Sequence, residues 1–171
     1  RDFCLSRGLG DVYKRQGYID TTFCEPFDSV EPLNPEYLTH TGDVVIRLTA
    51  PYTAVLITEQ LEGYVIPSSF VVVRTNKSLL LPEYLVWLIN SQSVKRQISE
   101  SAVSIMLGAV KPRYFADYEV DQLPLSHQRV LAELNGLAHR ETLLLTELAA
   151  EKEKYYGLLI NQVFTDMKRG N

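Results

Sequence analysis

One amphipathic pattern in the C-terminal part of the sequence constrains the fold more than any other feature. From Ser126 to about Asp166, glycine and proline are scarce and apolar residues recur every three or four positions. This spacing is the period of one face of an α-helix. About forty residues at 1.5 Å each predict a helix of roughly 60 Å. The rest of the chain is too small to bury an apolar face of that length, so something else must cover it.

The expected seam of this helix is irregular. Glu141 and Lys152 interrupt a strict heptad, and Gly136 and Gly157 lower the helix propensity by about 1 kcal/mol each relative to Ala. These interruptions favour an antiparallel pair of helices over a long uniform zipper. The alternative is a helix that folds back as a hairpin onto its own core. The residues expected to pack against a partner helix are Leu131, Leu134, Ala138, Leu145, Leu148, Tyr155 and Leu159.

Residues 43–125 have a different pattern, in which short runs rich in Val, Ile and Tyr alternate with Gly, Pro and Ser. Four strands are predicted within 33 residues, which is too close for crossover helices, so mostly antiparallel pairing is expected. A last strand is predicted at Tyr118–Leu123. The four strands are predicted at Asp43–Thr49, Ala54–Glu59, Gly63–Ile66 and Ser69–Thr75.

Two helices are predicted between these strands. Pro82 suits the first turn of a helix that ends near Ser91, and Ser93 is expected to cap a second helix that runs toward Ser101. Residues 105–110 are expected to form a loop. The sequence therefore predicts an α+β fold, with a mixed, mostly antiparallel sheet, one or two helices, and a long C-terminal helix of the coiled-coil type.

Composition indicates a soluble globular protein, with 46% hydrophobic and 22% charged residues. No apolar run approaches the roughly 18 residues that a membrane span needs. The two cysteines, Cys4 and Cys24, form no CxxC pair or other metal-ligand spacing. The absence of a disulfide framework favours a reducing compartment, so we expect a cytoplasmic protein.

The first sixteen residues, Arg1–Gln16, have no clear hydrophobic period and resemble translated adapter sequence. We expect residues 1–16 to be a non-native leader, residues 17–125 to be a globular domain, residues 126–166 to be a long helix, and residues 167–171 to be a tail. A phosphate loop at Gly8-Leu9-Gly10 is the alternative, but position 13 is Tyr where a third Gly is needed.

No catalytic pattern is evident in the sequence. His40, His127 and His139 are too far apart for a close zinc pair, and there is no GxSxG elbow or Walker loop. Residues 34–37 (Asn-Pro-Glu-Tyr) come near the Asn-Pro-Pro-Tyr loop of adenine methyltransferases but lack its second proline, so we expect a turn that starts a short helix. We expect no catalytic residue, no metal site and no cofactor.

The net charge of −4 conceals an asymmetry along the chain. Residues 17–62 carry one basic and eight acidic residues, whereas residues 63–116 carry six basic and two acidic residues. The total charge argues against a basic coat over the whole surface, but a local basic face is possible.

Four short sequence motifs follow one another along the chain in an order that is similar to that of a known protein family. They are Gly42-Asp43-Val44-Val45-Ile46, Pro82-Glu83-Tyr84-Leu85, the segment Val120–Gln128 and the terminal Gly157–Phe164. Together they resemble the DNA specificity subunit of type I restriction-modification enzymes, in which a "GDV(V/L)I" strand and a "PEYL" helix precede an "I-P-L-P-P-x-x-E-Q" exit into a long spacer helix. Here Leu125 and His127 replace the second proline and the Glu of that exit.

The resemblance implies a half-sized or partial specificity subunit, where family members usually have two recognition domains and two spacer helices. The implied subunit has one target recognition domain, residues 17–125, which is incomplete at its N-terminus, and one spacer helix, residues 126–166. The resemblance implies double-stranded DNA, methyltransferase subunits and a restriction subunit as partners, with no catalysis in this chain. It also implies that a second recognition domain and helix, from another copy or from a missing half, completes a bipartite reader.

The charges and the predicted loops suggest which residues would touch DNA. Our candidates are Arg47, Tyr52, Lys111, Arg113 and Tyr114, each beside a predicted strand end or loop. The best single stretch is Lys111-Pro112-Arg113-Tyr114, where two cations can reach phosphates or guanine and the tyrosine can stack. The alternatives are an adaptor that joins protein partners without binding DNA, and a small hydrolase or nuclease.

Overall fold

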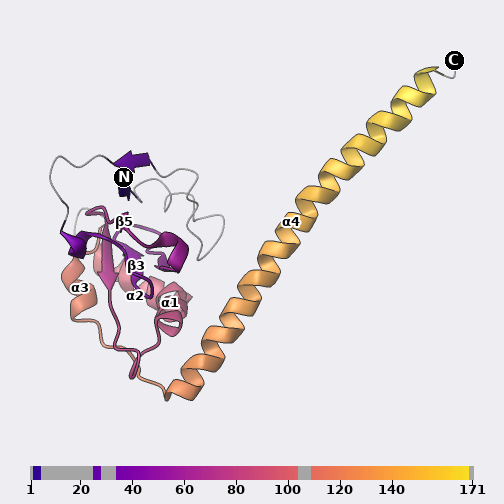
Figure 1. Ribbon diagram of the computed structural model, residues 1–171. Coiled ribbons are helices and arrows are strands. Elements are labelled where there is room, and N and C mark those ends of the chain that lie inside the picture. The colour runs from indigo at the N-terminus through magenta and orange to yellow at the C-terminus, as the bar shows by residue number, and fades with distance from the viewer. Residues whose placement is uncertain (1, 5–24, 28–33, 104–108, 170–171) are drawn as a thin grey trace. The chain divides into compact units, whose positions relative to one another are not determined.

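The computed structural model describes residues 2–4, 25–27, 34–103 and 109–169. Its backbone contacts divide into two compact units, residues 1–135 and residues 136–171. The strands are β1 (Asp2–Cys4), β2 (Glu25–Phe27), β3 (Val44–Arg47), β4 (Ala54–Leu56), β5 (Tyr64–Val65) and β6 (Phe70–Val73). The helices are the 3₁₀ turns η3 (Pro35–Tyr37) and η4 (Glu59–Leu61), and α1 (Pro82–Asn90), α2 (Gln92–Val103), α3 (Pro112–Ala116) and α4 (Leu125–Arg169) (Figure 1).

The central sheet has the order β4-β3-β6 and is antiparallel throughout. Its middle strand β3 is buried on both faces because its residues alternate between two hydrophobic clusters. Val44 and Ile46 face the larger cluster, which includes residues of α1 and α2, and Val45 faces a smaller one with Val55. The run Val44-Val45-Ile46 therefore reads as continuously apolar, as expected of a strand that is covered on both sides.

A second sheet has the order β2-β1-β5, in which β1 pairs antiparallel with β2 and parallel with β5. The parallel pair makes the fold mixed, as the sequence predicts. Residues Asp2–Cys4 of the expected leader form β1 of this sheet.

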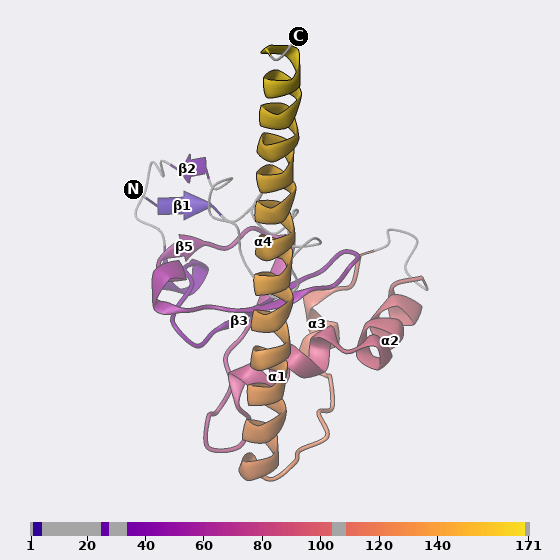
Figure 2. The same ribbon diagram turned by 90° about the vertical axis from the view of Figure 1, so that its right-hand side faces the viewer.

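Helices α1 and α2 cover one face of the central sheet, as Figures 1 and 2 both show. The last residue of α1, Asn90, uses its side chain in place of a further strand at the edge strand β4: its Oδ1 accepts from the Ala54 amide at 3.1 Å, and its Nδ2 donates to the Ala54 carbonyl at 2.8 Å. The cap of α2 differs from the prediction. Ser91, not Ser93, precedes this helix, and its hydroxyl oxygen accepts from the Val94 amide at 3.4 Å.

Helix α4 is one continuous helix of 45 residues, so the alternative of a helical hairpin is wrong. Its first turns join unit 1 through Gln128, which is fully buried. The Gln128 Oε1 accepts from the Leu81 amide at 2.8 Å, and its Nε2 donates to the carbonyls of Leu79 at 2.9 Å and Leu123 at 2.7 Å. The side chain thus joins the helix to two loop segments.

The strand predicted at Tyr118–Leu123 does not form. The alternation that suggested it is present, since Tyr118 and Val120 pack against the larger cluster. The backbone of the segment is held by side chains, however: the Tyr84 hydroxyl donates to the Asp121 carbonyl at 3.2 Å. The predicted loop at residues 105–110 lies mostly outside the described residues, although Ala109 forms an isolated bridge with Thr49.

Candidate functional site

The candidate residue Arg47 ends strand β3, opposite Phe70 of β6. It is half-buried, and its Nε donates to the Thr49 hydroxyl at 2.9 Å. The guanidinium is therefore partly occupied by its own strand, but the hydrogen bond leaves its other N–H groups for an acceptor outside the domain.

The structure places Tyr52 in the hydrophobic core, with 6% of its surface exposed. It follows a tight turn in which the Tyr52 amide donates to the Thr49 carbonyl at 2.9 Å across a cis Ala50–Pro51 peptide. A side chain at that depth cannot stack on a base, so Tyr52 is a core residue and not part of a contact surface. The sequence correctly indicated a loop here, but it did not indicate that the tyrosine ring points into the core.

The stretch Lys111–Tyr114 is not a loop. Lys111 occupies the N-cap position of the short helix α3, and Pro112 occupies its first turn, where a missing N–H costs nothing. Lys111 and Arg113 are exposed, and Arg113 forms an exposed ion pair with Asp117, Nε to Oδ2 at 3.2 Å. Tyr114 is half-buried and packs against the larger cluster, with its ring 5.8 Å from that of Tyr118.

Tyr118 is held as a hydrogen-bond donor beside α3. Burial raises the pKa of its hydroxyl, and Tyr114 and the Asp121 carboxylate raise it further. The protonated hydroxyl donates to the Gln97 Oε1 at 3.3 Å. This contact ties the segment after α3 to helix α2.

Backbone contacts bring these candidates to one end of β3. The Val110 amide donates to the Leu48 carbonyl at 2.8 Å, and Ala109 bridges Thr49. The segment that leads into α3 is therefore paired with the residues directly after Arg47. Three of the predicted cations, Arg47, Lys111 and Arg113, come from two adjacent segments at this end, whereas Tyr52 is buried and Tyr114 is partly so.

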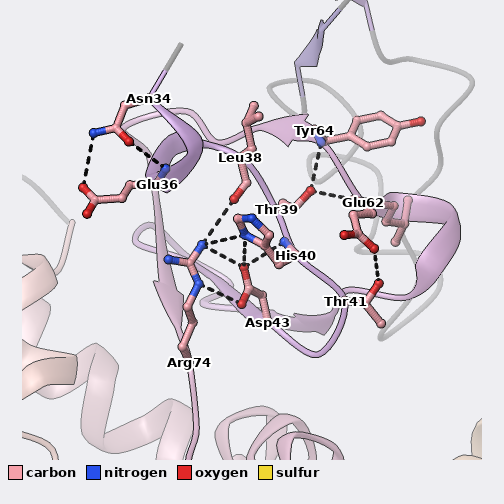
Figure 3. A network of polar contacts seen from close by, with 11 residues as sticks. Asn34, Glu36, Leu38, Thr39, His40, Thr41, Asp43, Glu62, Tyr64 and Arg74 are labelled. Atoms are coloured by element: carbon pink, nitrogen blue, oxygen red, sulfur yellow. Dashed lines mark hydrogen bonds and ion pairs between the residues drawn. The ribbon is translucent and has the colours of Figure 1, made fainter.

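A polar network that the sequence did not predict lies at the other end of β3 (Figure 3). The Asp43 carboxylate is 5% exposed and accepts from Arg74, with Nε to Oδ1 at 3.0 Å and Nη2 to Oδ2 at 3.2 Å. It also accepts from the His40 amide at 3.0 Å. Because Val44 pairs with Val73, Asp43 and Arg74 are the residues directly before and after that pair.

The same guanidinium orients the His40 ring. Arg74 Nη2 lies 3.1 Å from His40 Nδ1 and also donates to the Leu38 carbonyl at 3.3 Å. A guanidinium has no acceptor, so a hydrogen bond from Nη2 to Nδ1 requires the tautomer with the ring proton on Nε2. The Gly42-Asp43 motif of the sequence is thus part of a turn whose buried Asp43 carboxylate is bound by Arg74, 31 residues away.

An open pocket of about 340 Å³ lies over this turn. We call it the turn pocket; it is lined by His40, Thr41, Gly42, Asp43, Arg74, Thr75 and Lys77. Gly42 has φ +94, and a Cβ added there would lie 2.9 Å from the Lys77 Nζ. The positive φ favours glycine at this position, and a larger residue would also displace the tip of the Lys77 side chain. The only sequence signal for the pocket was the basic excess of residues 63–116.

Helix α4 presents a wide apolar surface in unit 2 and in its first turns. Of the predicted seam residues, Leu131 is half-buried, and Leu134, Ala138, Leu145, Leu148, Tyr155 and Leu159 are exposed. Leu137, Leu144 and Leu158, which the prediction missed, are also exposed and recur at multiples of seven residues. With Leu145 and Leu148, the first two line an apolar depression along the helix.

Within the described residues, no group of three or more His, Cys, Asp and Glu side chains is placed to hold a metal ion. None of the helices in that part of the chain is long and apolar enough to cross a membrane.

No protein-family model matches the sequence, and no curated protein is similar to it in sequence. Solved structures that are similar in fold include the following two. One is a chain from a structural study of complex assembly and conformational transition in the type I R-M system, with a TM-score of 0.59 and 24% identity. The match covers 76% of this chain and 34% of that chain, and at this identity it indicates a shared fold.

The other is the HsdS subunit from Thermoanaerobacter tengcongensis, with a TM-score of 0.53 and 28% identity over 71% of this chain and 32% of that chain. The chain therefore spans about a third of the length of the solved chains that it matches. These comparisons confirm the predicted resemblance to type I restriction-modification specificity subunits, and the structure confirms the predicted α+β fold with a long C-terminal helix.

Proposed function

We propose that this chain recognises double-stranded DNA as a specificity subunit, or as part of one, in a type I restriction-modification system. The observation that carries the proposal is the combination of a small α+β domain and a 45-residue helix in one chain that is similar to an HsdS subunit. In this function the chain performs no chemistry and directs adenine methyltransferase and restriction subunits to a bipartite site in the cytoplasm.

The proposed contact surface lies at the end of β3 that adjoins α3. Lys111, Arg113 and Arg47 would neutralise backbone phosphates and set the register of the domain on the duplex. Arg113 would exchange its exposed Asp117 partner for a phosphate at little cost, because exposed ion pairs contribute only about 0–1 kcal/mol. Tyr114 is anchored in the core and would present its hydroxyl edge, not its ring face.

Helix α4 would separate two recognition domains by pairing antiparallel with a second helix. Its exposed Leu144, Leu145 and Leu148 would then be buried against the partner. The partner is either a second copy of this chain, which would form an isologous dimer that reads a palindromic site, or the other half of a longer subunit.

Co-expression with a type I methyltransferase subunit tests the function directly. We expect methylated adenines in host DNA to cluster in a two-part sequence with a fixed spacer. The rival adaptor function is supported by the exposed apolar helix and the net charge of −4. It predicts no sequence-dependent methylation and no salt-dependent binding to duplex DNA, and that pair of results would refute our proposal.

A further inference from the structure

We propose that the turn pocket binds a phosphate group, and that in the proposed DNA-binding function this group is a phosphate of the DNA backbone. The inference rests on that function and extends it to the end of β3 opposite Lys111 and Arg113. It adds Lys77, His40 and Arg74 to the contacts that the sequence predicted.

The first argument is the set of unused donors in the pocket. Among the described residues, Lys77 has no hydrogen-bond or ion-pair partner. Arg74 is 47% exposed on its side chain and uses only Nε and Nη2 on Asp43, Leu38 and His40, which leaves Nη1. In the tautomer that accepts the hydrogen bond from Arg74, the His40 Nε2 carries the ring proton. An ammonium, a guanidinium edge and an imidazole N–H are together suited to phosphate oxygens.

The second argument is a buried hydroxyl without a partner. Thr75 also lines the pocket, and its Oγ1 is buried and makes no hydrogen bond. Buried polar atoms are nearly always satisfied in folded proteins, so an orphan of this kind calls for an explanation. A phosphate oxygen bound in the pocket would give this hydroxyl an acceptor.

The third argument is electrostatic. The residues that line the pocket carry two permanent positive charges, Arg74 and Lys77, and one negative charge, Asp43. The Asp43 carboxylate is already neutralised by Arg74, so the ammonium of Lys77 remains uncompensated. Glu62 accepts from the Thr41 hydroxyl at 2.6 Å beside the pocket, and this second carboxylate should keep the affinity for free phosphate low. A duplex presents many phosphates at once, so its total attraction for the cations of the domain exceeds the local repulsion from Glu62.

The fourth argument is spacing. Asp43 and Thr49 flank β3 on its two sides, and six residue steps span at most about 20 Å. The turn pocket lies at one end of this segment, and the Lys111 cluster lies at the other. Cationic sites at the two ends of this segment would contact phosphates at two separate places on the duplex. A domain held at both ends would have a defined register on the duplex.

The test is the salt dependence of binding to a fluorescent 30-base-pair duplex for the wild-type chain, Lys77→Gln and Lys152→Gln. Lys152 is an exposed cation on α4 and serves as the charge-matched control. Loss of one phosphate contact should lower the slope of log affinity against log salt by about 0.9, which corresponds to about eightfold weaker binding at 0.1 M salt. Lys152→Gln should retain the wild-type slope.

A Lys77→Gln slope equal to the wild-type slope would overturn the inference and leave the proposed function intact. If the wild-type chain binds no duplex, the proposed function fails, and a titration with inorganic phosphate then decides about the pocket. Shifts of the His40 ring resonances that Lys77→Gln abolishes would support an anion site for a different ligand. Because Glu62 keeps the affinity for free phosphate low, the titration is carried to the highest soluble phosphate concentration, and unshifted His40 resonances there would remove the site altogether.

Discussion

Gln128 offers the sharpest test of how the long helix is attached to the recognition domain. Replacing it with Leu keeps a side chain of similar size but removes three hydrogen bonds, to the Leu81 amide and to the carbonyls of Leu79 and Leu123. At a net contribution of about 1 kcal/mol for each bond, the Gln128→Leu variant should lose about 3 kcal/mol of unfolding free energy. For a domain of roughly 100 residues, this corresponds to a melting temperature lower by about 12–24 °C.

The sequence contains a matched control for this substitution. Gln122 donates to the same Leu79 carbonyl at 3.3 Å but is exposed. The Gln122→Leu variant should therefore change the unfolding free energy by no more than about 0.5 kcal/mol. The fluorescence of Trp87, the single tryptophan, is a suitable assay because it lies in α1 and not in α4. Equal melting temperatures for the two variants would refute the view that Gln128 holds the helix to the domain.

Three further predictions concern the contact surface, the turn and the helix. Changing Lys111 and Arg113 together to Ala should weaken duplex binding and reduce the salt slope by about 2, as measured by fluorescence anisotropy; an unchanged slope would exclude α3 from the interface. Asp43→Ala should cost about 2 kcal/mol in a denaturant titration, because Arg74 loses its buried carboxylate but remains half exposed; full stability would mean that the pair is not structural. Placing Glu at both Leu144 and Leu148 should convert an α4-paired dimer to a monomer in sedimentation experiments while leaving the Trp87 melt unchanged. A wild-type chain that sediments as a monomer at high concentration would instead contradict pairing between two copies.

Much of the secondary structure could be predicted because its signals are local. The period of the apolar residues identified α4 almost to its ends, and Pro82 marked the first turn of α1. The short apolar runs between Gly, Pro and Ser residues located β3 and β6. Prediction from local patterns failed where a strand-like alternation was present but the segment does not pair with a strand. Residues 118–123 alternate like a strand, yet the Tyr84 hydroxyl of α1 donates to the Asp121 carbonyl, and the Gln122 side chain donates to the Leu79 carbonyl in the segment after β6.

The candidate contact residues were only partly predictable for a related reason. A sequence indicates that a residue follows a strand, but not whether the turn sends its side chain outward or into the core. Lys111 and Arg113 are exposed at the end of β3, whereas Tyr52, from an equally polar-looking turn, fills the larger cluster. Its burial depends on how the turn packs against α1 and α2, which no local pattern contains.

The sequence by itself determined a small mixed-sheet domain, a long helix with an apolar face too large for that domain to cover, and the order of phrases that resembles a specificity subunit. These features are periodic or adjacent along the chain. Only the tertiary structure decided that Asp43 is neutralised by Arg74 and that Gln128 holds the loop at Leu79, since those partners are 31 and 49 residues apart. Strand register and helix docking bring them together, and for that reason the turn pocket is visible only in the folded chain.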